Sequence, residues 1–520
     1  MPTVAVIGGG PAGATAAALL AKRRFTVCVF ESSHFPRPHI GESLLPATIE
    51  ALEFSGAAAK VREAAFTVKN GATMAWGVDH ALWTWYFRET NTSQPHAYQV
   101  NRDEFDELLL RHAAACGAEI CEGAEVRHVI FEDGIAQGIE VNNQFHAFDY
   151  VIDASGQSSL IAQQRNTKIW DQDFRNLAIY QYFEGGTHLD GDATGNILVE
   201  SVEDGWLWKI PLKHNISSVG LVADRERALA AIRLTSVETW FTTVIKSSEH
   251  TSKLLLGANA ISDCTATRDW SYASSQFTGS RHSLIGDAAC FIDPLFSTGV
   301  HLAIYSATLC AALVATTFSD SNLEMLARES FERQYRRQYE HFRELARLFY
   351  GANRAVDSYF WEARRITGAT AYSPRAAFVR AVSGQTALGY ERTTLSHGVL
   401  PTAFTLALEH LEGDREARRT ALGELTTCDF ALGKNIEVVE TALFAGTVYE
   451  HGQVIRRENL DDIPVSPFVA DIIALVNIET MSHMRLNAAL AAKGWSKEVI
   501  QTSLTPTLQL LFVEGVINTT

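Results

Sequence analysis

The sequence predicts an α/β fold: a Rossmann-like nucleotide-binding domain with an inserted β-sheet part and a mainly helical carboxy-terminal region. Three observations lead to this class. The apolar run Val4–Ile7, typical of a buried strand, passes directly into the glycine-rich turn Gly8–Gly13 and a helical pattern over Ala14–Ala21. The aromatic segment Gly205–Pro211 has the alternation of a strand. A long uncharged helical pattern begins near Gly299.

The amino-terminal turn has the residue types that a dinucleotide site requires. Gly8 permits the tight turn, Gly10 lets the backbone approach a pyrophosphate, and Gly13 lets helix and strand pack closely. The helix amino terminus supplies positive potential to the phosphates. A second strand, Thr26–Phe30, ends at Glu31, where a carboxylate can bind ribose hydroxyls. We therefore expect a bound dinucleotide rather than a structural glycine loop.

Composition narrows the class of protein. With 520 residues, 47% of them hydrophobic, the chain can form a large core and at least one added domain, so we expect two or three domains. A formal charge of -16 argues against a nucleic-acid or anionic-membrane partner. The 7 cysteines lack zinc-ligand spacing, so no metal site is expected. Reduced thiols and the absence of a signal-peptide pattern in Met1–Gly10 favour a cytoplasmic enzyme.

The uncharged stretch Gly299–Phe318 approaches the length of a membrane-spanning helix. It contains polar residues such as His301 and follows a loop of the cofactor-binding type. We expect a buried helix there and no membrane segment.

Two later segments indicate which dinucleotide binds. Val151–Gly156 and Leu284–Ala289 resemble the later nucleotide-contact segments of the flavoprotein monooxygenase superfamily. The resemblance implies FAD, with Asp287 on the flavin ribose; the alternative is that Asp287 only caps a helix. Arg102, which opens another helix, resembles the arginine that lies near the cofactor in that superfamily, and a surface capping role is the alternative.

No second glycine-rich turn follows a strand, so the chain shows no nicotinamide-binding domain of its own. We expect reduced flavin to come from a separate flavin reductase. Single-component hydroxylases of the same superfamily also lack such a motif, so the alternative stays open.

The segment Gly205–Pro211 contains the spacing Trp-x-Trp-x-Ile-Pro, which resembles the signature of the flavin-dependent halogenases. On a strand Trp206 and Trp208 share one face, so they can form a wall on the flavin side of a cavity, together with Pro211. An aromatic pair in the core of a sheet is the alternative.

Lys69 lies in Phe66–Ala72, which resembles the segment that carries the active-site lysine of these halogenases. The resemblance implies that hypohalous acid reaches this lysine. A buried ammonium can hydrogen-bond the oxidant, and the neutral amine can become a haloamine; burial favours the neutral form. Without the resemblance, a solvated lysine would be the expectation.

Two loops resemble further parts of the halogenase site. Phe35–Pro46 is similar to the family's flavin-side loop, in which His39 or Glu42 is an acid–base candidate and loop positioning is the alternative. Asp293–Val300 is similar to the halide and flavin segment, in which amides beside Thr298 and Gly299 bind chloride at a helix amino terminus. The residues expected to contact the cofactor are Gly8, Gly10, Pro11, Ala12, Gly13, Glu31, Gly41, Glu42, Ser43, Arg102, Asp153, Gly156, Gly286, Asp287, Gly299 and Val300.

The halide segment departs from the tryptophan halogenases. Those enzymes carry a glutamate immediately before the Ser-Thr pair, whereas this chain has Phe296. The difference argues against indole as the substrate. It matches the phenol and pyrrole halogenases, whose rings are activated by their own hydroxyl group or ring nitrogen.

The resemblance to the phenol-type halogenases continues through Asp357–Arg365 and Gly389–Arg392. Beyond it, helical patterns over Val469–Val476, Met484–Lys493 and Lys497–Val513 precede Glu514–Ile517, and together they resemble a winged-helix module. These helices lack a basic face, so DNA binding is not expected. A dimer contact, a dock for a carrier protein and inert packing are left open.

The resemblance implies a GR2-type Rossmann-like FAD-binding domain and the following division of the chain. The expected parts are 1–350 as the halogenase core, with FAD contacts in 1–45, 100–160 and 280–320 and sheet-rich substrate parts at about 60–100 and 170–275; 351–460 as a helical region; and 461–520 as a possible winged-helix-like module.

The implied function is that of a halogenase in secondary-metabolite (antibiotic) biosynthesis. It would use FADH2, O2 and chloride or bromide to halogenate a phenol-like or pyrrole-like aromatic substrate, free or tethered to a carrier protein, through Lys69. The alternatives are a hydroxylase or a reductase of the same superfamily and a non-catalytic flavoprotein that acts as an assembly partner. The oligomeric state is left open.

Overall fold

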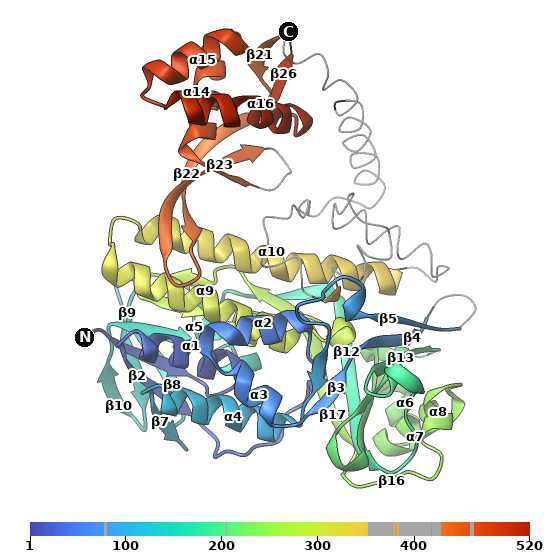
Figure 1. The fold of residues 1–520 in the computed structure, drawn as a ribbon. Helices are drawn as coiled ribbons and strands as arrows, with labels where there is room; N and C mark the ends of the chain where they lie inside the picture. The colour runs from blue at the N-terminus through green and yellow to red at the C-terminus, as the bar shows by residue number, and fades with distance from the viewer. Residues whose placement is uncertain are drawn as a thin grey trace.

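The computed structural model describes residues 1–76, 81–203, 205–351, 428–457 and 462–519, with the single residues 379, 382, 383 and 418. Two sheets form the main body, two long helices cross it, and a carboxy-terminal part stands above it (Figure 1).

The first sheet is the predicted nucleotide-binding sheet. Its pairs β1·β2, β2·β7, β1·β11 and β11·β19 are parallel, and the short β18 closes one edge in antiparallel fashion. Near-continuous Val and Ile runs suit such a sheet, because it is covered on both faces. The six strands, in spatial order, are β18 (Thr278–Gly279), β19 (His282–Leu284), β11 (Tyr150–Asp153), β1 (Thr3–Ile7), β2 (Thr26–Glu31) and β7 (Glu119–Glu122).

Helices and a small meander cover this sheet. Helix α1 (Pro11–Lys22) packs against α4 (Arg102–Ala115) and α9 (Gly299–Ser319), and α2 (Pro46–Ser55) and α3 (Ala58–Glu63) lie beside them (Figure 1). The meander packs on β11 and α5. It consists of β8 (Val126–Glu132), β9 (Ile135–Val141) and β10 (Gln144–Ala147), with α5 at Leu160–Gln164.

The second sheet is the inserted sheet that the sequence predicts. Its largely antiparallel strands place alternate residues on opposite faces, and one face packs on α6 (Arg225–Leu234) and α7 (Val237–Ser247), with α8 (Thr251–Leu254) beside them. In spatial order the strands are β20 (Cys290–Phe291), β17 (Thr265–Ser274), β12 (Lys168–Glu184), β15 (Ile216–Asp224), β14 (Gly205–Pro211), β13 (Ile197–Val202), β4 (Gly71–Ala75) and β5 (Leu82–Tyr86), and β16 (Asn259–Ala260) pairs with β12. A separate two-stranded sheet joins β3 (Thr67–Lys69) to β6 (Ala97–Gln99).

The long apolar stretch near Gly299 forms α9, which is long and apolar enough to cross a membrane by composition. In the structure 89% of its apolar window is buried, against α1, α2 and the long helix α10 (Glu324–Gly351). The expected buried helix is confirmed.

The helical prediction for 351–460 is wrong for residues 429–457. This segment forms β21 (Asp429–Leu432) and the long hairpin of β22 (Ile436–Phe444) and β23 (Tyr449–Arg457), which is joined by β24 (Ile463–Val465). Its β-branched residues and the turn at Gly446, where φ is 80°, favour a hairpin over a helix. The segments Asp357–Arg365 and Gly389–Arg392 lie outside the described residues.

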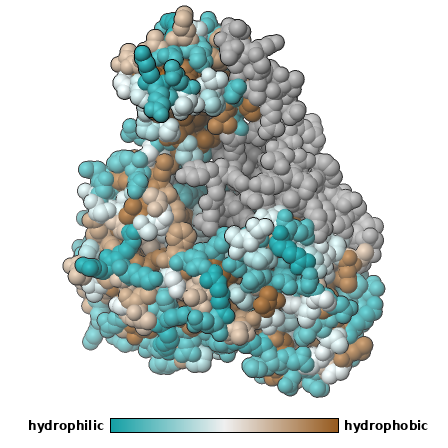
Figure 2. All heavy atoms as spheres, in the orientation of Figure 1, coloured by the Kyte–Doolittle hydropathy of each residue, from teal (hydrophilic) through white to brown (hydrophobic). Residues whose placement is uncertain are grey.

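The β22–β23 hairpin forms an arm between the main body and the carboxy-terminal part. Its tip is fixed to the long helices: the Tyr449 amide donates to Thr316 Oγ1 at 2.8 Å, and the Ser330 hydroxyl donates to the Ala442 carbonyl oxygen. On the face seen in Figure 2, apolar residues gather along this arm.

The carboxy-terminal part contains the three helices that the sequence predicts. They are α14 (Pro467–Ile478), α15 (His483–Ala492) and α16 (Lys497–Val513), and Ser466, Ser482 and Ser496 cap their amino termini. The last strand, β26 (Ile517–Thr519), begins three residues later than expected, because 514–516 turn the chain; with β21 and β25 (Met481–Ser482) it forms a small sheet.

Candidate active site

The glycine-rich turn leads from β1 into α1 as a dinucleotide site requires. Gly8 has a φ of 102°, in the left-handed region that favours glycine. A side chain at Gly13 would strike the Gly8 carbonyl oxygen, and one at Gly10 would lie 3.3 Å from the Arg37 guanidinium. The N-cap Gly10 makes no side-chain capping bond to α1, and Pro11 is the first helical residue. The turn therefore fits a close-lying pyrophosphate at the helix amino terminus.

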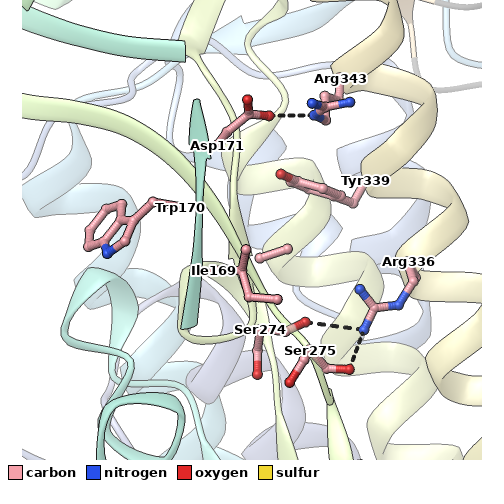
Figure 3. Close-up of a pocket in the computed structure, with 9 residues that line it drawn as sticks. Ile169, Trp170, Asp171, Ser274, Ser275, Arg336, Tyr339 and Arg343 are labelled. Carbon is pink, nitrogen blue, oxygen red and sulfur yellow. Dashed lines mark hydrogen bonds and ion pairs between the residues drawn. The ribbon is translucent and has the colours of Figure 1, made fainter. Parts of the chain in front are cut away.

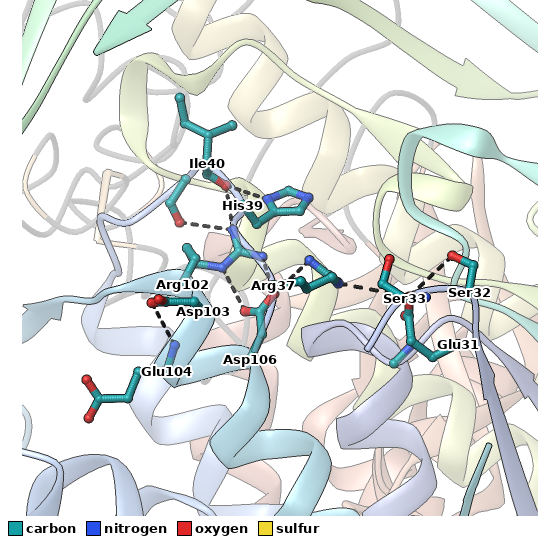
Figure 4. A network of polar contacts seen from close by, with 12 residues as sticks. Glu31, Ser32, Ser33, Arg37, His39, Ile40, Arg102, Asp103, Glu104 and Asp106 are labelled. Carbon is teal, nitrogen blue, oxygen red and sulfur yellow. Dashed lines mark hydrogen bonds and ion pairs between the residues drawn. The ribbon is translucent and has the colours of Figure 1, made fainter. Parts of the chain in front are cut away.

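Glu31, at the end of β2, is held in place by backbone amides. Its Oε2 accepts a hydrogen bond from the Gly9 amide at 2.8 Å, and its Oε1 accepts one from the Ser33 amide at 2.9 Å. Arg37 Nε lies 4.0 Å from Glu31 Oε1 (Figure 4). The carboxylate thus borders the turn, as the sequence predicts for a ribose-binding acid.

Arg102 is buried, with 6% of its surface exposed, so it is not a surface capping residue. Its Nε and Nη2 donate to the two carboxylate oxygens of Asp106 at 2.7 and 2.9 Å, and its Nη1 donates to the Ile40 carbonyl oxygen at 2.6 Å and to that of Gly41 at 3.2 Å (Figure 4). A paired guanidinium of this kind is rigid. Arg102 therefore fixes the middle of the predicted flavin-side loop, at Ile40 and Gly41.

The two later segments predicted to contact FAD, Val151–Gly156 and Leu284–Ala289, both lie beside the glycine-rich turn and the start of α1. Asp153, at the end of β11, accepts hydrogen bonds from the Ser155 and Ile161 amides at 3.0 and 2.7 Å. In this structure its carboxylate therefore stabilises the loop around Gly156. Burial raises the pKa of Asp287 to about 6, against the positive charges of Arg102 and Lys168. A carboxyl group between two cations fits a polar ligand such as a ribose.

The backbone of the Gly286–Asp287 turn is held by two buried tyrosines. Tyr335 donates to the Gly286 carbonyl oxygen at 2.9 Å, and Tyr272 donates to that of Asp287 at 2.6 Å. No pattern in the sequence indicates these partners, because they come from α10 and β17, far from the turn in the chain.

Lys69, the predicted catalytic residue, is the last residue of β3 and is 1% exposed. Its Nζ donates to the Leu44 carbonyl oxygen at 2.9 Å and lies 5.5 Å from the centroid of the Phe87 ring. Burial penalises the ammonium form and lowers the pKa of Lys69 from 10.5 to about 7. Near neutral pH this lysine is therefore a mixture of ammonium and free amine.

One short strand connects Lys69 to the flavin-side loop. Lys69 pairs with Ala97 of β6, and the same β6 holds the loop through the Leu44 amide, which donates to the Tyr98 carbonyl oxygen at 3.0 Å, and through the Ser43–Gln99 bridge. The flavin-side loop and Lys69 are thus neighbours, joined through β6 and by the bond from Lys69 Nζ to the Leu44 carbonyl oxygen.

Glu42, in that loop, is 1% exposed. Its Oε1 accepts a hydrogen bond from the Tyr182 hydroxyl at 2.8 Å. Burial raises the pKa of Glu42, while the Tyr182 hydrogen bond and the charge of Arg102 oppose the rise. His39 is exposed, and Arg102 is the main cause of its lowered pKa of about 4. Of the two acid–base candidates, Glu42 is therefore the interior one; Tyr182, its partner, was not predicted.

Trp206 and Trp208 share one face of β14, as predicted, with ring centroids 5.9 Å apart and both side chains buried. The Trp208 indole lies against Gly220 of β15, where a side chain would overlap it. The Trp206 indole nitrogen donates to the Tyr350 hydroxyl at 2.5 Å, and Tyr350 donates to Asp293 Oδ2 at 2.6 Å. The tryptophan pair is thus tied to the loop that precedes α9.

That loop ends at the predicted halide site. Thr298 precedes α9 without making a side-chain capping bond, and its buried Oγ1 has no hydrogen-bond partner. A side chain at Gly299 would meet open space. An orphaned buried hydroxyl and an open helix start fit an anion and the edge of a flavin.

Phe296, where tryptophan halogenases carry glutamate, is 6% exposed. It packs on Phe349 of α10 with ring centroids 5.1 Å apart. The position is therefore an apolar contact between the loop and α10, with no carboxylate.

A surface pocket of about 360 Å³ lies elsewhere, between β12, β17 and α10 (Figure 3). Arg343 pairs with Asp171 at 2.5 Å, and Arg336 donates to the Ser274 and Ser275 carbonyl oxygens (Figure 3). None of the predicted site residues lines it.

The fold and the site are those of a flavoprotein of the monooxygenase type. Its distinguishing feature is the buried amine of Lys69, which lies against the flavin-side loop. The family model described as tryptophan halogenase matches residues 3–95 and 86–395. The chain is 34% identical over 371 residues, 70% of each chain, to a tryptophan 2-halogenase of Chondromyces crocatus. It is 28% identical over 382 residues, 67% of this chain and 84% of the other, to a 1H-pyrrole-2-carbonyl-[peptidyl-carrier protein] chlorinase of Pseudomonas fluorescens.

A solved structure extends the similarity to the whole chain. The flavin-dependent halogenase CmlS superposes with a TM-score of 0.71 at 27% identity, covering 100% of this chain and 96% of that one. The chain therefore belongs to the flavin-dependent halogenase family, and it is an FAD-dependent halogenase.

Proposed function

We propose that this enzyme takes reduced FAD from a separate flavin reductase and, with O2 and chloride or bromide, transfers halogen through Lys69 to an electron-rich aromatic carbon. The observation that carries the proposal is the buried Lys69 amine, whose pKa of about 7 makes it a nucleophile near neutral pH. Lys69 lies beside the loop that bears Glu42: its Nζ bonds to the Leu44 carbonyl oxygen of that loop, and β6 pairs with both.

The cofactor would be held by the glycine-rich turn, Glu31, Arg102 and Asp287, and the halide by the start of α9. When bound, reduced FAD would activate O2, and the activated oxygen would be the oxidant that converts halide into hypohalous acid. The chain's own task is to hold the anion beside Thr298 and to keep bulk water out with the Trp206–Trp208 wall.

Lys69 then carries the halogen. The neutral amine attacks the halogen of hypohalous acid: the N–halogen bond forms, the O–halogen bond breaks, and the amine proton leaves with the hydroxide as water. The haloamine passes the halogen to the ring carbon as the N–halogen bond breaks; the ring carbon then loses one proton, and the nitrogen takes up one proton, which restores the neutral amine. The hydrogen bond to the Leu44 carbonyl oxygen orients the nitrogen for both steps.

We propose a phenol-like or pyrrole-like substrate, free or carrier-tethered. Phe296 supplies no carboxylate at the position that tryptophan halogenases use, so the ring must be activated by its own hydroxyl group or ring nitrogen. The Pseudomonas relative is named for a carrier-bound pyrrole, which supports a tethered substrate. The Chondromyces relative is named for tryptophan, so indole is the competing substrate class. A cytoplasmic location is part of the proposal, because the cysteines of the described residues are all free thiols.

The test combines purified enzyme, FAD, a flavin reductase, nicotinamide and either halide with phenols, a carrier-bound pyrrole and tryptophan. We expect products with halogen isotope patterns from phenols or pyrrole, and none with Lys69→Ala. Hydroxylated products in the presence of halide would contradict the proposal, and halogenated tryptophan as the main product would overturn the substrate class.

A further inference from the structure

Three potential metal ligands come together on the nucleotide-binding sheet, outside the site described above. Cys28 lies on β2, and Glu119 and Cys121 lie on the adjacent strand β7. Glu119 and Cys121 are two residues apart, so they share one face of β7, and Cys28 stands directly beside Glu119 in the register. Among the described residues, these three bring their ligand atoms within 4.8 Å of one another.

We propose that Cys28, Cys121 and Glu119 bind one zinc ion, with a water molecule as the fourth ligand. The two Sγ atoms are 3.4 Å apart, and Cys121 Sγ lies 4.0 Å from Glu119 Oε1. A tetrahedral zinc ion requires sulfur–sulfur and sulfur–oxygen separations of about 3.8 and 3.6 Å. Both observed distances lie within about 0.4 Å of these, a difference that side-chain rotation can supply.

The charges at this cluster also favour a cation. The two half-buried thiols and the Glu119 carboxylate stand next to one another, so as anions they would repel. Glu122, also on β7, pairs with Arg111, but among the described residues no ion pair with a basic side chain is found for Glu119. A bound dication offsets the repulsion among two thiolates and a carboxylate. The exposed Glu119 gives the ion a path from solvent.

The position of the cluster gives binding a structural consequence. Strand β7 is the edge of the six-stranded sheet, and β2 ends at Glu31, three residues after Cys28. A zinc bridge between these strands would fix the edge to the strand that carries the ribose-binding acid. A zinc ion that binds the folded state and not the unfolded state raises the melting temperature of the protein.

The experiment uses full-length, FAD-loaded protein. Wild type is mixed with zinc chloride, separated from free metal by gel filtration, and its zinc content is measured by elemental mass spectrometry. We expect about one zinc per chain, as one tetrahedral site requires, with a raised melting temperature. Cys28→Ser and Cys121→Ser each lose the zinc, whereas Cys264→Ser, a change at a half-buried cysteine outside the cluster, retains it. Glu119→Gln weakens zinc binding by about tenfold or more, since the loss of a residue that only hydrogen-bonds to a metal ligand already has an effect of that size.

Cobalt identifies the ligands independently. We expect the wild type with cobalt(II) to show tetrahedral d–d bands at longer wavelength than oxidised flavin absorbs, and Cys121→Ser to lack them. If Cys28→Ser fails to fold, Cys121→Ser on the edge strand decides, with its metal-free melting curve as the folding control. Zinc retention by Cys121→Ser equal to that of the wild type, or no retention by the wild type, overturns the proposal.

Discussion

The substitution Lys69→Met exploits the burial of the lysine to make a prediction about stability. The unfolded chain holds the proton on this lysine up to a pKa of 10.5, but the folded protein holds it only to about 7. Between these values the unfolded state binds one more proton, so the stability of the wild type rises with pH. Methionine fills a similar volume and does not titrate.

The size of the effect follows from the two pKa values. Burying the amine costs roughly 4 kcal/mol at pH 7 and roughly 2 kcal/mol at pH 9. The lost hydrogen bond to Leu44 is worth about 1 kcal/mol at both pH values. We therefore expect Lys69→Met to be more stable than the wild type at pH 7, and its advantage to shrink by about 2 kcal/mol at pH 9.

The assay is urea unfolding of both proteins at the two pH values, followed by tryptophan fluorescence. Exposed Lys60→Met is the matched control, for which no pH-dependent difference is expected. An advantage of Lys69→Met that is the same at pH 7 and pH 9 would refute the reasoning that burial lowers the pKa of this lysine in the folded protein.

Three further substitutions test the glycine-rich turn and the tryptophan wall. Gly13→Ala places a methyl group on the Gly8 carbonyl oxygen, so we expect a loss of about 1–3 kcal/mol in unfolding free energy and release of FAD during gel filtration; retained FAD would contradict the fit. Gly220→Ala displaces the Trp208 ring and so opens the tryptophan wall to water. The amount of halogenated product per oxygen consumed should fall; an unchanged ratio would show that the wall does not protect the oxidant. Trp206→Phe removes the bond to Tyr350; we expect a loss of about 0.5–1.5 kcal/mol in thermal unfolding, and an unaltered transition would show that the bond contributes nothing.

The sequence alone predicted the parts of the fold that depend on local pattern. The strand, glycine turn and helix over 3–22 appear as expected, because apolar periodicity and glycine positions act within a few residues. The helices α14, α15 and α16 also agree, and each has a serine cap that the sequence shows. The arm of β22 and β23 was not predicted, because its residues fall within the expected helical region 351–460.

Contacts between distant segments could not be predicted. Tyr182 and Glu42 are 140 residues apart in the sequence, and Tyr350 and Trp206 are 144 apart. No local pattern in the sequence could therefore predict either hydrogen bond. The same holds for Cys28 and Cys121, which only the pairing of β2 and β7 brings together. Lys69 was found through its resemblance to a family segment, and its burial follows from tertiary packing.

The central claim, that the Lys69 amine carries the halogen, is tested most directly by supplying the enzyme with pre-reduced FAD, oxygen and chloride but no aromatic substrate. After rapid digestion, mass spectrometry of the peptide that contains Lys69 should show one chlorine in place of one amine hydrogen, and addition of substrate before digestion should remove it. An unmodified Lys69 peptide from enzyme that goes on to chlorinate substrate added afterwards would contradict the account.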